Sequence, residues 1–247
     1  CRQIRANSLD LFEIRIIQSF TDSTAMAVKN LSVSIGKGER VAVLGRNGAG
    51  KSTTIRLLMG ALRPDSGSAR VLGTDVSSPE FRAVKEDIGV VLDEAYFPES
   101  LNAVQVGKIL AATYRRWDQS LYEGYLKRFD LPGNKQFKDY SRGMRMKLAI
   151  AAALSHHPKL LVLDEATAGL DPIVRDEVLD IFNEFTREED HSILISSHIL
   201  SDLEKLCDYI AFLHKGDLLF CEEKDRLLEE YGIFMDSQEN LDCLLPE

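Results

Sequence analysis

The chain has 247 residues, enough for one large domain or for one domain that carries an inserted subdomain. Hydrophobic residues make up 45% of it and charged residues 28%, with 16 Gly and 7 Pro, which excludes disordered, collagen-like and coiled-coil classes. The 30 basic and 39 acidic residues give a net charge of −9, so a polyphosphate backbone would on average repel the chain. Nucleic acid is therefore not an expected direct partner.

The cysteines indicate a reducing compartment. Cys1, Cys207, Cys221 and Cys243 form no CxxC pair and lack the dense spacing of secreted domains, so we interpret them as reduced, cytosolic thiols. The longest uninterrupted apolar run, residues 148–154, is far shorter than the roughly 18 residues that span a bilayer. No basic stretch leads into an apolar segment, so no signal peptide is expected, and the first residue being Cys leaves the natural start open.

Strand patterns begin early in the chain. Residues 27–35 alternate apolar and polar side chains before a Gly-Lys-Gly turn, which is typical of an antiparallel strand. Short runs rich in Val, Ile and Leu follow, separated by segments of helical periodicity. These runs are residues 40–44, 88–92, 160–163 and 192–195. Continuous apolar strands that alternate with helices predict a mainly parallel sheet covered on both faces.

The middle of the chain is different. Between residues 99 and 141 no strand of comparable quality is predicted, whereas residues 104–116 and 121–129 have helical patterns, broken by Pro132-Gly133. We predict a mostly helical insertion here.

The last third returns to helix and strand. A helix is predicted to begin after Asp171, which can cap it, with Pro172 in the first turn and apolar residues on one stripe. The stripe is Val174, Val178, Ile181, Phe182 and Phe185. Residues 209–221 read as strand, turn and strand, a second antiparallel addition. From residue 235 the sequence is acidic and lacks caps, as in a frayed tail.

A phosphate-binding motif follows the strand at residues 40–44. The match to GxxxxGK[ST] is Gly45, Arg46, Asn47, Gly48, Ala49, Gly50, Lys51 and Ser52, and a helical run follows at once. Glycines let backbone N–H groups approach phosphate oxygens, and the helix N-terminus adds partial positive charge. We expect Lys51 to reach the β- and γ-phosphates, the Ser52 hydroxyl to bind Mg²⁺, and Thr53 to donate one more hydrogen bond.

Two carboxylates stand where ligands bind in open α/β sheets. Asp164 and Glu165 end the apolar strand that begins at residue 160. Asp164 would hold hydrated Mg²⁺ and Glu165 would polarise the attacking water, although such paired acids can instead cap a helix. A further strand leads to His198, which can donate to a γ-phosphate or be merely structural.

Four features in fixed order resemble the nucleotide-binding subunit of an ATP-binding cassette transporter. They are Gly45 to Ser52, Ser141 to Met144, Leu160 to Glu165 with its continuation to Asp171, and His198. The match covers about residues 12–231. Within the family the chain is most similar to ATPases of bacterial exporters with a separate permease, such as bacteriocin, antibiotic and peptide export systems.

The resemblance implies an α/β fold: a P-loop NTPase of ABC type with a mainly parallel core sheet, an antiparallel β subdomain and an inserted α-helical subdomain. We expect the ATPase domain at residues 12–234, the helical subdomain at about 94–156 and an acidic tail at 235–247.

In that family two copies bind head to tail, and each ATP lies between one copy's P-loop and the other's signature helix. The signature here would be Ser141, Arg142, Gly143 and Met144, which departs from the usual LSGGQ at Tyr140, Arg142 and Met144. The Ser141 hydroxyl and the Gly143 N–H would face the γ-phosphate. Arg142 either contacts the other copy or points to solvent. The alternative for the whole segment is that it only caps the helix that follows.

A second departure follows the strand at residues 88–92. The family commonly has a glutamine there, whereas this chain has Asp93 and Glu94. Asp93 can accept from metal-bound water but cannot donate, and a solvated acidic turn is the alternative. Tyr96 and Phe97 would lie near the groove that receives a permease's cytoplasmic helix, as anchors or as ordinary packing.

Two more roles come from the resemblance. Phe20 is the candidate for stacking on adenine. Asp171 would link one active site to the other subunit, although capping the following helix is equally physical.

We therefore expect a cytoplasmic ATPase that binds ATP and Mg²⁺, dimerises with itself or a sister subunit, and drives a transmembrane permease on the inner face of the membrane, for export. A non-transport cassette ATPase that remodels a macromolecular complex is the rival, and such relatives usually have tandem cassettes, coiled coils or a basic surface. A regulatory module that holds ATP without turnover is a third possibility, which Asp164, Glu165 and His198 argue against. The transported substrate is not predicted.

Overall fold

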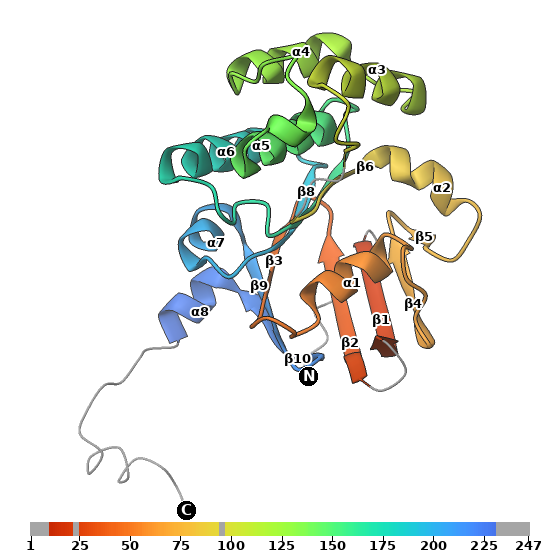
Figure 1. Cartoon of the computed structure of the whole chain (residues 1–247). Coiled ribbons are helices and arrows are strands. Elements are labelled where there is room, and N and C mark those ends of the chain that lie inside the picture. Colours follow the sequence, from red (N-terminus) through yellow and green to blue (C-terminus); the bar gives the residue numbers. More distant parts are fainter. Residues whose placement is uncertain (1–9, 22–24, 94–96, 231–247) are drawn as a thin grey trace, which may run out of the picture.

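A large sheet forms the centre of the protein. The structure, a computed structural model, describes residues 10–21, 25–93 and 97–230. Within these residues a six-stranded sheet has the order β10-β9-β3-β8-β7-β6 (Figure 1). Its strands are β3 (Arg40–Leu44), β6 (Ile88–Val91), β7 (Leu160–Asp164), β8 (Ser192–Ser196), β9 (Tyr209–His214) and β10 (Asp217–Glu223). All neighbours pair in parallel except β9 and β10, which confirms a mainly parallel core.

The uninterrupted apolar strands are explained by two hydrophobic cores, one on each face of the sheet. Leu160 and Val162 of β7 belong to the core that contains α1 (Lys51–Leu58). Leu161 and Leu163 belong to the other core, with α5 (Arg142–Leu154) and α6 (Pro172–Phe185). Because successive side chains of a strand point to opposite faces, both sets must be apolar.

A smaller antiparallel sheet lies beyond α1. It has the order β2-β1-β4-β5 in the described residues. Its strands are β1 (Asp10–Thr21), β2 (Ala25–Gly36), β4 (Ser66–Val71) and β5 (Thr74–Asp75). Ile55 of α1 packs in one core with Leu31 of β2 and Val71 of β4, so α1 is enclosed between the two sheets. The predicted antiparallel strand at residues 27–35 is confirmed as part of β2.

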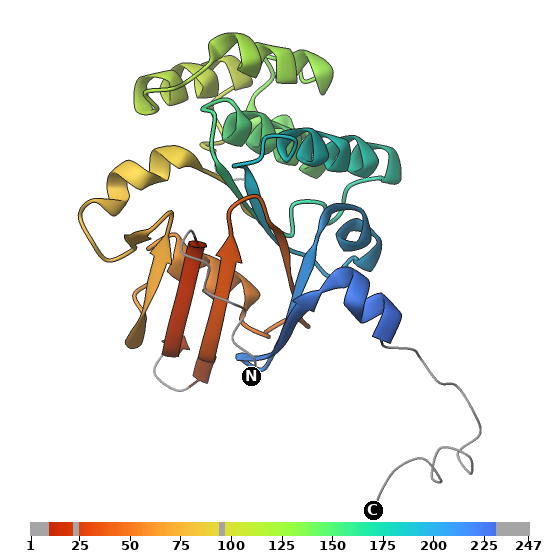
Figure 2. The same ribbon diagram turned by 180° about the vertical axis from the view of Figure 1, so that it is seen from behind.

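Helices cover the other face of the large sheet. The described residues between 97 and 156 form α3 (Ala103–Thr113), α4 (Gln119–Arg128), η3 (Phe137–Asp139) and α5, with one isolated bridge between Asn102 and Gln136. Figures 1 and 2 show α3 and α4 above α5 and α6, with the small sheet and α8 at opposite ends of the molecule. The remaining helices are α2 (Phe81–Val84), η2 (Lys85–Asp87), α7 (Leu200–Leu206) and α8 (Lys224–Glu230).

The domain limits at 12–234 and 94–156 stay predictions, and the tail at 235–247 lies outside the described residues.

One expectation needs correction. The pair at residues 209–221 is antiparallel within itself, but β9 pairs in parallel with β3 and so belongs to the main sheet. The hairpin pattern determines only the direction of β10 relative to β9. The direction of β9 follows from the crossover through α7, which returns the chain parallel to β8.

The described cysteines are free thiols. Cys207 is buried and Cys221 is partly buried. Burial raises the pKa of each thiol to about 12, so both stay protonated near neutral pH. Cys1 and Cys243 lie outside the described residues. None of the helices in the described ranges combines the length and apolar content that a bilayer crossing requires.

The amphipathic helix α6 gives a test of the fold. Phe182 is 0% exposed in the core, whereas Ile173 at the start of the same helix is 83% exposed. Phe182→Ala should lower the free energy of unfolding by about 3–5 kcal/mol, because it removes apolar contacts and leaves a cavity. Ile173→Ala, the control, should change it by less than about 0.5 kcal/mol. Urea denaturation followed by circular dichroism measures both, and equal losses would contradict the packing of α6.

Candidate functional site

The candidate site is built where parallel strands end side by side. In the sheet register Ser196 at the end of β8 lies between Val43 of β3 and Asp164 of β7. The loops that follow these strands therefore start from one edge, and they carry the glycine motif, the paired carboxylates and His198. The sequence separates these features widely, and the sheet brings them together.

The glycine loop has the backbone shape of an anion cradle. Gly48 and Gly50 have φ of 79° and 107°, a region that favours glycine. Gly45 is needed for a different reason, since a methyl group there would come within 2.5 Å of the Leu213 carbonyl oxygen. The Gly216 N–H donates to the Ala49 carbonyl at 3.0 Å, so the turn between β9 and β10 holds the loop from behind.

Lys51 is buried at the start of α1. Its side chain is only 7% exposed, and Nζ donates to the Gly45 carbonyl at 2.8 Å. The same Nζ lies 3.5 Å from Glu165 Oε1. A largely buried ammonium needs such partners, because its desolvation would otherwise be costly. Lys51 therefore connects the glycine loop with the carboxylate end of β7.

Glu165 is held from two sides. Its φ of 51° is unusual for a residue with a side chain. Its N–H donates to the carbonyl and hydroxyl oxygens of Ser196 at 3.0 and 3.2 Å, which secures this conformation. The carboxylate reaches Lys51 through Oε1 and lies 2.7 Å from His198 Nδ1 through Oε2. A carboxylate fixed in this way can accept a proton from a bound water.

Asp164 offers a single, nearly buried carboxylate. It is 6% exposed, and its Oδ1 accepts a hydrogen bond from Ser196 Oγ at 2.5 Å. Ser52 is half-buried on the first turn of α1. No group of three or more His, Cys, Asp or Glu able to hold a metal occurs in the described ranges. One carboxylate and one hydroxyl suit Mg²⁺, which usually keeps waters and substrate phosphate oxygens as its other ligands.

The predicted signature lies at the N-terminus of α5. Ser141 caps that helix, since its Oγ accepts from the Met144 N–H at 3.3 Å. Gly143 faces Leu170, and Met144 is partly buried against the helical core. Arg142 is exposed and has a partner that neither sequence alternative named, because its Nη2 donates to Asp93 Oδ1 of the same chain at 2.9 Å, while its contact with another copy stays a prediction. The described contacts of Asp93 are with Arg142, and none joins it to the site around Asp164.

The remaining predicted residues have mixed outcomes. Asp171 caps α6 by accepting from the Val174 N–H at 3.1 Å, so its capping role is observed and its role between subunits stays a prediction. Thr53 is half-buried, while the neighbouring Thr54 donates its hydroxyl to the Gly50 carbonyl at 2.9 Å.

The structure describes the remaining aromatic and acidic candidates only in part. The backbone of Phe20 lies in β1, paired with Met26, but its side chain is outside what the structure describes. Glu94 and Tyr96 also lie outside the described residues. Phe97 packs edge-on against Phe137 with ring centres 5.6 Å apart, so its packing role is observed and its role as an anchor stays a prediction.

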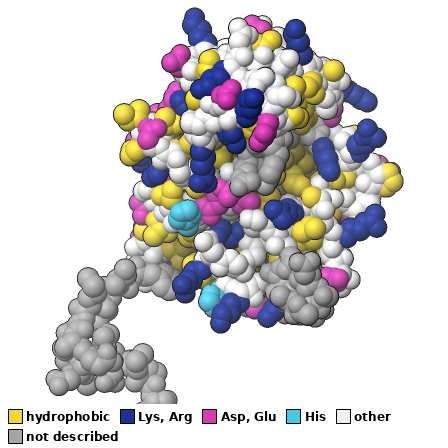
Figure 3. Space-filling model, viewed as in Figure 1, with side chains coloured by type: hydrophobic (Ala, Val, Ile, Leu, Met, Phe, Trp, Pro, Cys, Tyr) yellow, Lys and Arg dark blue, Asp and Glu magenta, His cyan; other side chains and the backbone are white. Residues whose placement is uncertain are grey.

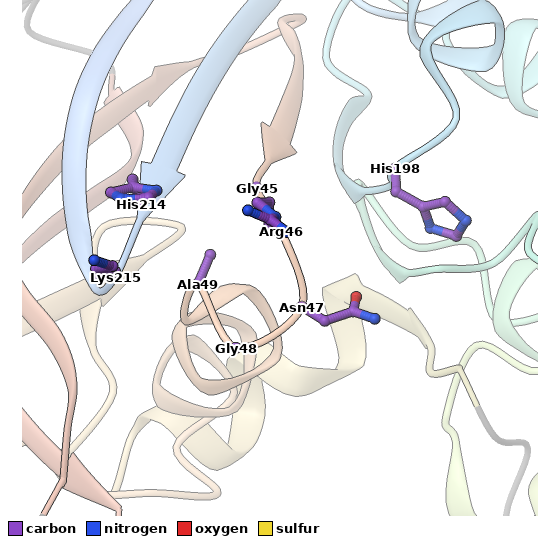
Figure 4. Close-up of a pocket in the computed structure, with 8 residues that line it drawn as sticks. All are labelled: Gly45, Arg46, Asn47, Gly48, Ala49, His198, His214 and Lys215. Atoms are coloured by element: carbon purple, nitrogen blue, oxygen red, sulfur yellow. The ribbon is translucent and has the colours of Figure 1, made fainter.

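The glycine loop (residues 45–49), His198, His214 and Lys215 line an open pocket of about 500 Å³. Figure 4 shows His198 on one side of the glycine loop and, on the other, His214 at the end of β9 and Lys215 in the turn that follows it. In Figure 3 acidic side chains gather in the middle of this face, below the helical layer, with histidine and basic side chains around them.

Sequence reasoning missed His214, Lys215 and Ser196. A Lys-Gly turn alone carries no sign of a neighbouring pocket. Ser196 has a signal, because it is a polar residue that closes an apolar strand beside the carboxylates.

Comparison with known proteins agrees with this geometry. Residues 28–168 match the sequence model of the ABC transporter family. The ABC transporter ATP-binding protein YtrB of Bacillus subtilis is 32% identical over 221 residues, and the match covers 90% of this chain and 75% of YtrB. The bacitracin transport ATP-binding protein BcrA of Bacillus licheniformis is 35% identical, with 81% of this chain and 67% of BcrA covered. The lantibiotic transport ATP-binding protein SrtF of Streptococcus pyogenes is 37% identical, with 80% and 85% covered.

Solved structures give the same fold. A structure described as the ATP binding subunit of an ABC transporter has a TM-score of 0.79 and 26% identity, and the match covers 95% of this chain and 98% of the other. The ATP-binding cassette MJ0796, solved as a dimer bound to ADP and Pi, has a TM-score of 0.77 at 21% identity, with 86% and 98% covered. The second likeness supports the fold alone.

Gly45 tests the cradle. Gly45→Ala places a methyl group against the Leu213 carbonyl, which is backbone and cannot move away cheaply. Overpacking of this kind costs about 1–3 kcal/mol, so affinity for ADP should fall by roughly tenfold in a calorimetric titration. Gly124→Ala is the matched control, because a methyl group on Gly124 meets nothing within 4 Å. Unchanged ADP affinity in Gly45→Ala would argue against a tight loop.

Proposed function

The chain belongs to the ABC transporter family, in which it is an ATP-binding subunit and an ATPase, and from this premise we propose that two such subunits close over ATP and drive a membrane permease in export. The observation that carries the proposal is the Glu165 carboxylate, held 3.5 Å from Lys51 Nζ and 2.7 Å from His198 Nδ1. These contacts hold a proton acceptor beside Lys51, the residue that follows the glycine loop.

Nucleotide binding uses the cradle. N–H groups of the glycine loop and the positive end of α1 bind phosphate oxygens, and Lys51 exchanges its bond with the Gly45 carbonyl for the β- and γ-phosphates. Phe20 would stack on adenine. Magnesium fits Asp164 and Ser52, and when bound it neutralises charge on the phosphates.

Hydrolysis follows from the position of Glu165. Water attacks the γ-phosphorus as the bond to the ADP oxygen breaks, ADP leaves with the bonding electrons, and Glu165 accepts the proton that the water loses. His198 orients this carboxylate. Since Nδ1 donates to Glu165, His198 can give a further hydrogen bond to the γ-phosphate from Nε2 only as the imidazolium.

A second copy would complete the site. Ser141 and Gly143 stand at the N-terminus of the 13-residue α5, whose positive end suits a γ-phosphate. No described contact brings this end of α5 to the glycine loop of its own chain. The nucleotide of a second copy, or of a sister subunit, is the partner that we propose for it, with Asp171 between the two sites.

An apolar groove supports the permease as partner. It has a volume of about 270 Å³ and lies between α1 and the end of β6. Its lining includes Met59, Lys85, Val90, Leu92 and Tyr114. Burial raises the pKa of the Tyr114 phenol, which therefore stays neutral. We assign this groove to a short cytoplasmic helix of the permease, which would hold the ATPase at the inner face of the membrane. Export as the direction is supported by the relatives named for bacitracin and lantibiotic transport.

Variants of the catalytic residues test hydrolysis. Glu165→Gln should lower the ATPase rate by about 10²–10⁴-fold, because the amide cannot take the proton, while ATP remains bound. Lys51→Ala should instead weaken ATP binding, since it removes the cation at the phosphates. Phosphate release and equilibrium nucleotide binding separate the two effects. Hydrolysis at the parent rate in both variants would refute the assignment.

The groove gives a separate test of transport coupling. Val90 is 37% exposed in the groove, so Val90→Glu should abolish co-purification with a multi-span membrane protein by burying a charge against the docked helix. Val104→Glu is the control, because Val104 is 41% exposed but does not line the groove. If detergent extracts yield no membrane partner with the parent chain, the non-transport ATPase becomes the better hypothesis.

A further inference from the structure

The departures from the family pattern at Asp93 and Arg142 meet in one ion pair. Arg142 stands where the usual signature has glycine, and Asp93 stands where the family commonly has glutamine. Their side chains lie 2.9 Å apart, Nη2 to Oδ1, and are 58% and 53% exposed. The pair joins the N-terminus of α5 to the loop after β6.

The surroundings define where the guanidinium lies. Gly169, with φ of 73°, approaches it so closely that a methyl group there would come within 3.0 Å of Nη1. Arg145, one turn along α5, is used differently, because it donates to the carbonyls of Tyr140 and Lys138. The described side-chain hydrogen bonds of Arg142 go to Asp93 alone. Of the two arginines, Arg142 is therefore the one that can exchange its partner for another anion.

We propose that Asp93 is a positioning residue that holds Arg142 in the nucleotide-free chain, and that the triphosphate bound by a second copy displaces Asp93 from Arg142. This inference rests on the proposed function, since it needs the end of α5 to face the nucleotide of another copy. The Asp93 carboxylate thereby binds the guanidinium as a phosphate would, because both anions accept hydrogen bonds from the N–H groups of an arginine.

The balance of charge favours exchange. An exposed carboxylate pair with arginine is weak, because water screens it and the side chains lose freedom. A triphosphate carries more negative charge and accepts charge-assisted hydrogen bonds from the same N–H groups. Removing Asp93 takes away a competitor at each site, so dimerisation should need less ATP.

The experiment measures the ATP concentration at half-maximal dimerisation. Sedimentation velocity of Glu165→Gln protein with Mg-ATP gives this value without turnover. Adding Asp93→Asn should lower it by roughly two- to fivefold, the range expected for an exposed ion pair. Arg142→Ala should raise it, and Asp93→Asn should then have no further effect in that background.

Glu184→Gln is the matched control. Glu184 pairs with Arg128 at 2.8 Å with similar exposure, 45% and 38%, and lies in none of the motifs. Its loss should leave the ATP requirement unchanged.

Other outcomes overturn the inference. An equal gain from Asp93→Asn with and without Arg142 would mean that Asp93 acts by general repulsion of ATP. An increased ATP requirement that excess Mg²⁺ restores would make Asp93 a metal ligand. No effect of Asp93→Asn would leave the pair without a role. If the Glu165→Gln parent stays monomeric, the proposed function fails and the inference with it.

Discussion

The fixed position of the Glu165 carboxylate depends on side chains from separate elements. Lys51 comes from α1 and His198 from the loop after β8, and both reach the same carboxylate. The left-handed backbone of Glu165 is a strain of about 1–3 kcal/mol, which the bonds from its N–H to Ser196 help to offset. This arrangement exists only while β3, β7 and β8 keep their register. The two hydrophobic cores that pack against these strands are therefore a requirement of the chemistry as well as of stability.

The charges around the candidate site fall into two groups. Lys51, Asp164 and Glu165 are largely buried and have partners within the chain, so their arrangement resists solvent and salt. Arg142 and Asp93 are half exposed, and their pairing is correspondingly weak. The partnered, largely buried charges thus lie in the half-site that one chain supplies, and the exposed Arg142–Asp93 pair lies where we propose that a second copy binds.

Sequence predicted the parts of the fold that local pattern controls. Residues 40–44 are a strand in the structure because the apolar run is long enough and the glycine motif marks its end. Strand β4 was missed, since Ala69 and Val71 are its buried apolar residues and it is stabilised by non-local pairing with β1 and by pairing with β5. The Asp93–Arg142 bond joins residues 49 positions apart, and no local pattern encodes such a contact. Ser196 could have been found once β7 and β8 were known to be neighbours.

The support that the β9–β10 turn gives to the glycine loop has a consequence for recognition. Leu213 and Gly216 hold the loop through contacts with Gly45 and Ala49 that need no ligand. A segment that is already ordered loses little backbone entropy when an anion arrives, so the free energy of the phosphate contacts appears as affinity. The chain thus meets its nucleotide as a rigid receptor.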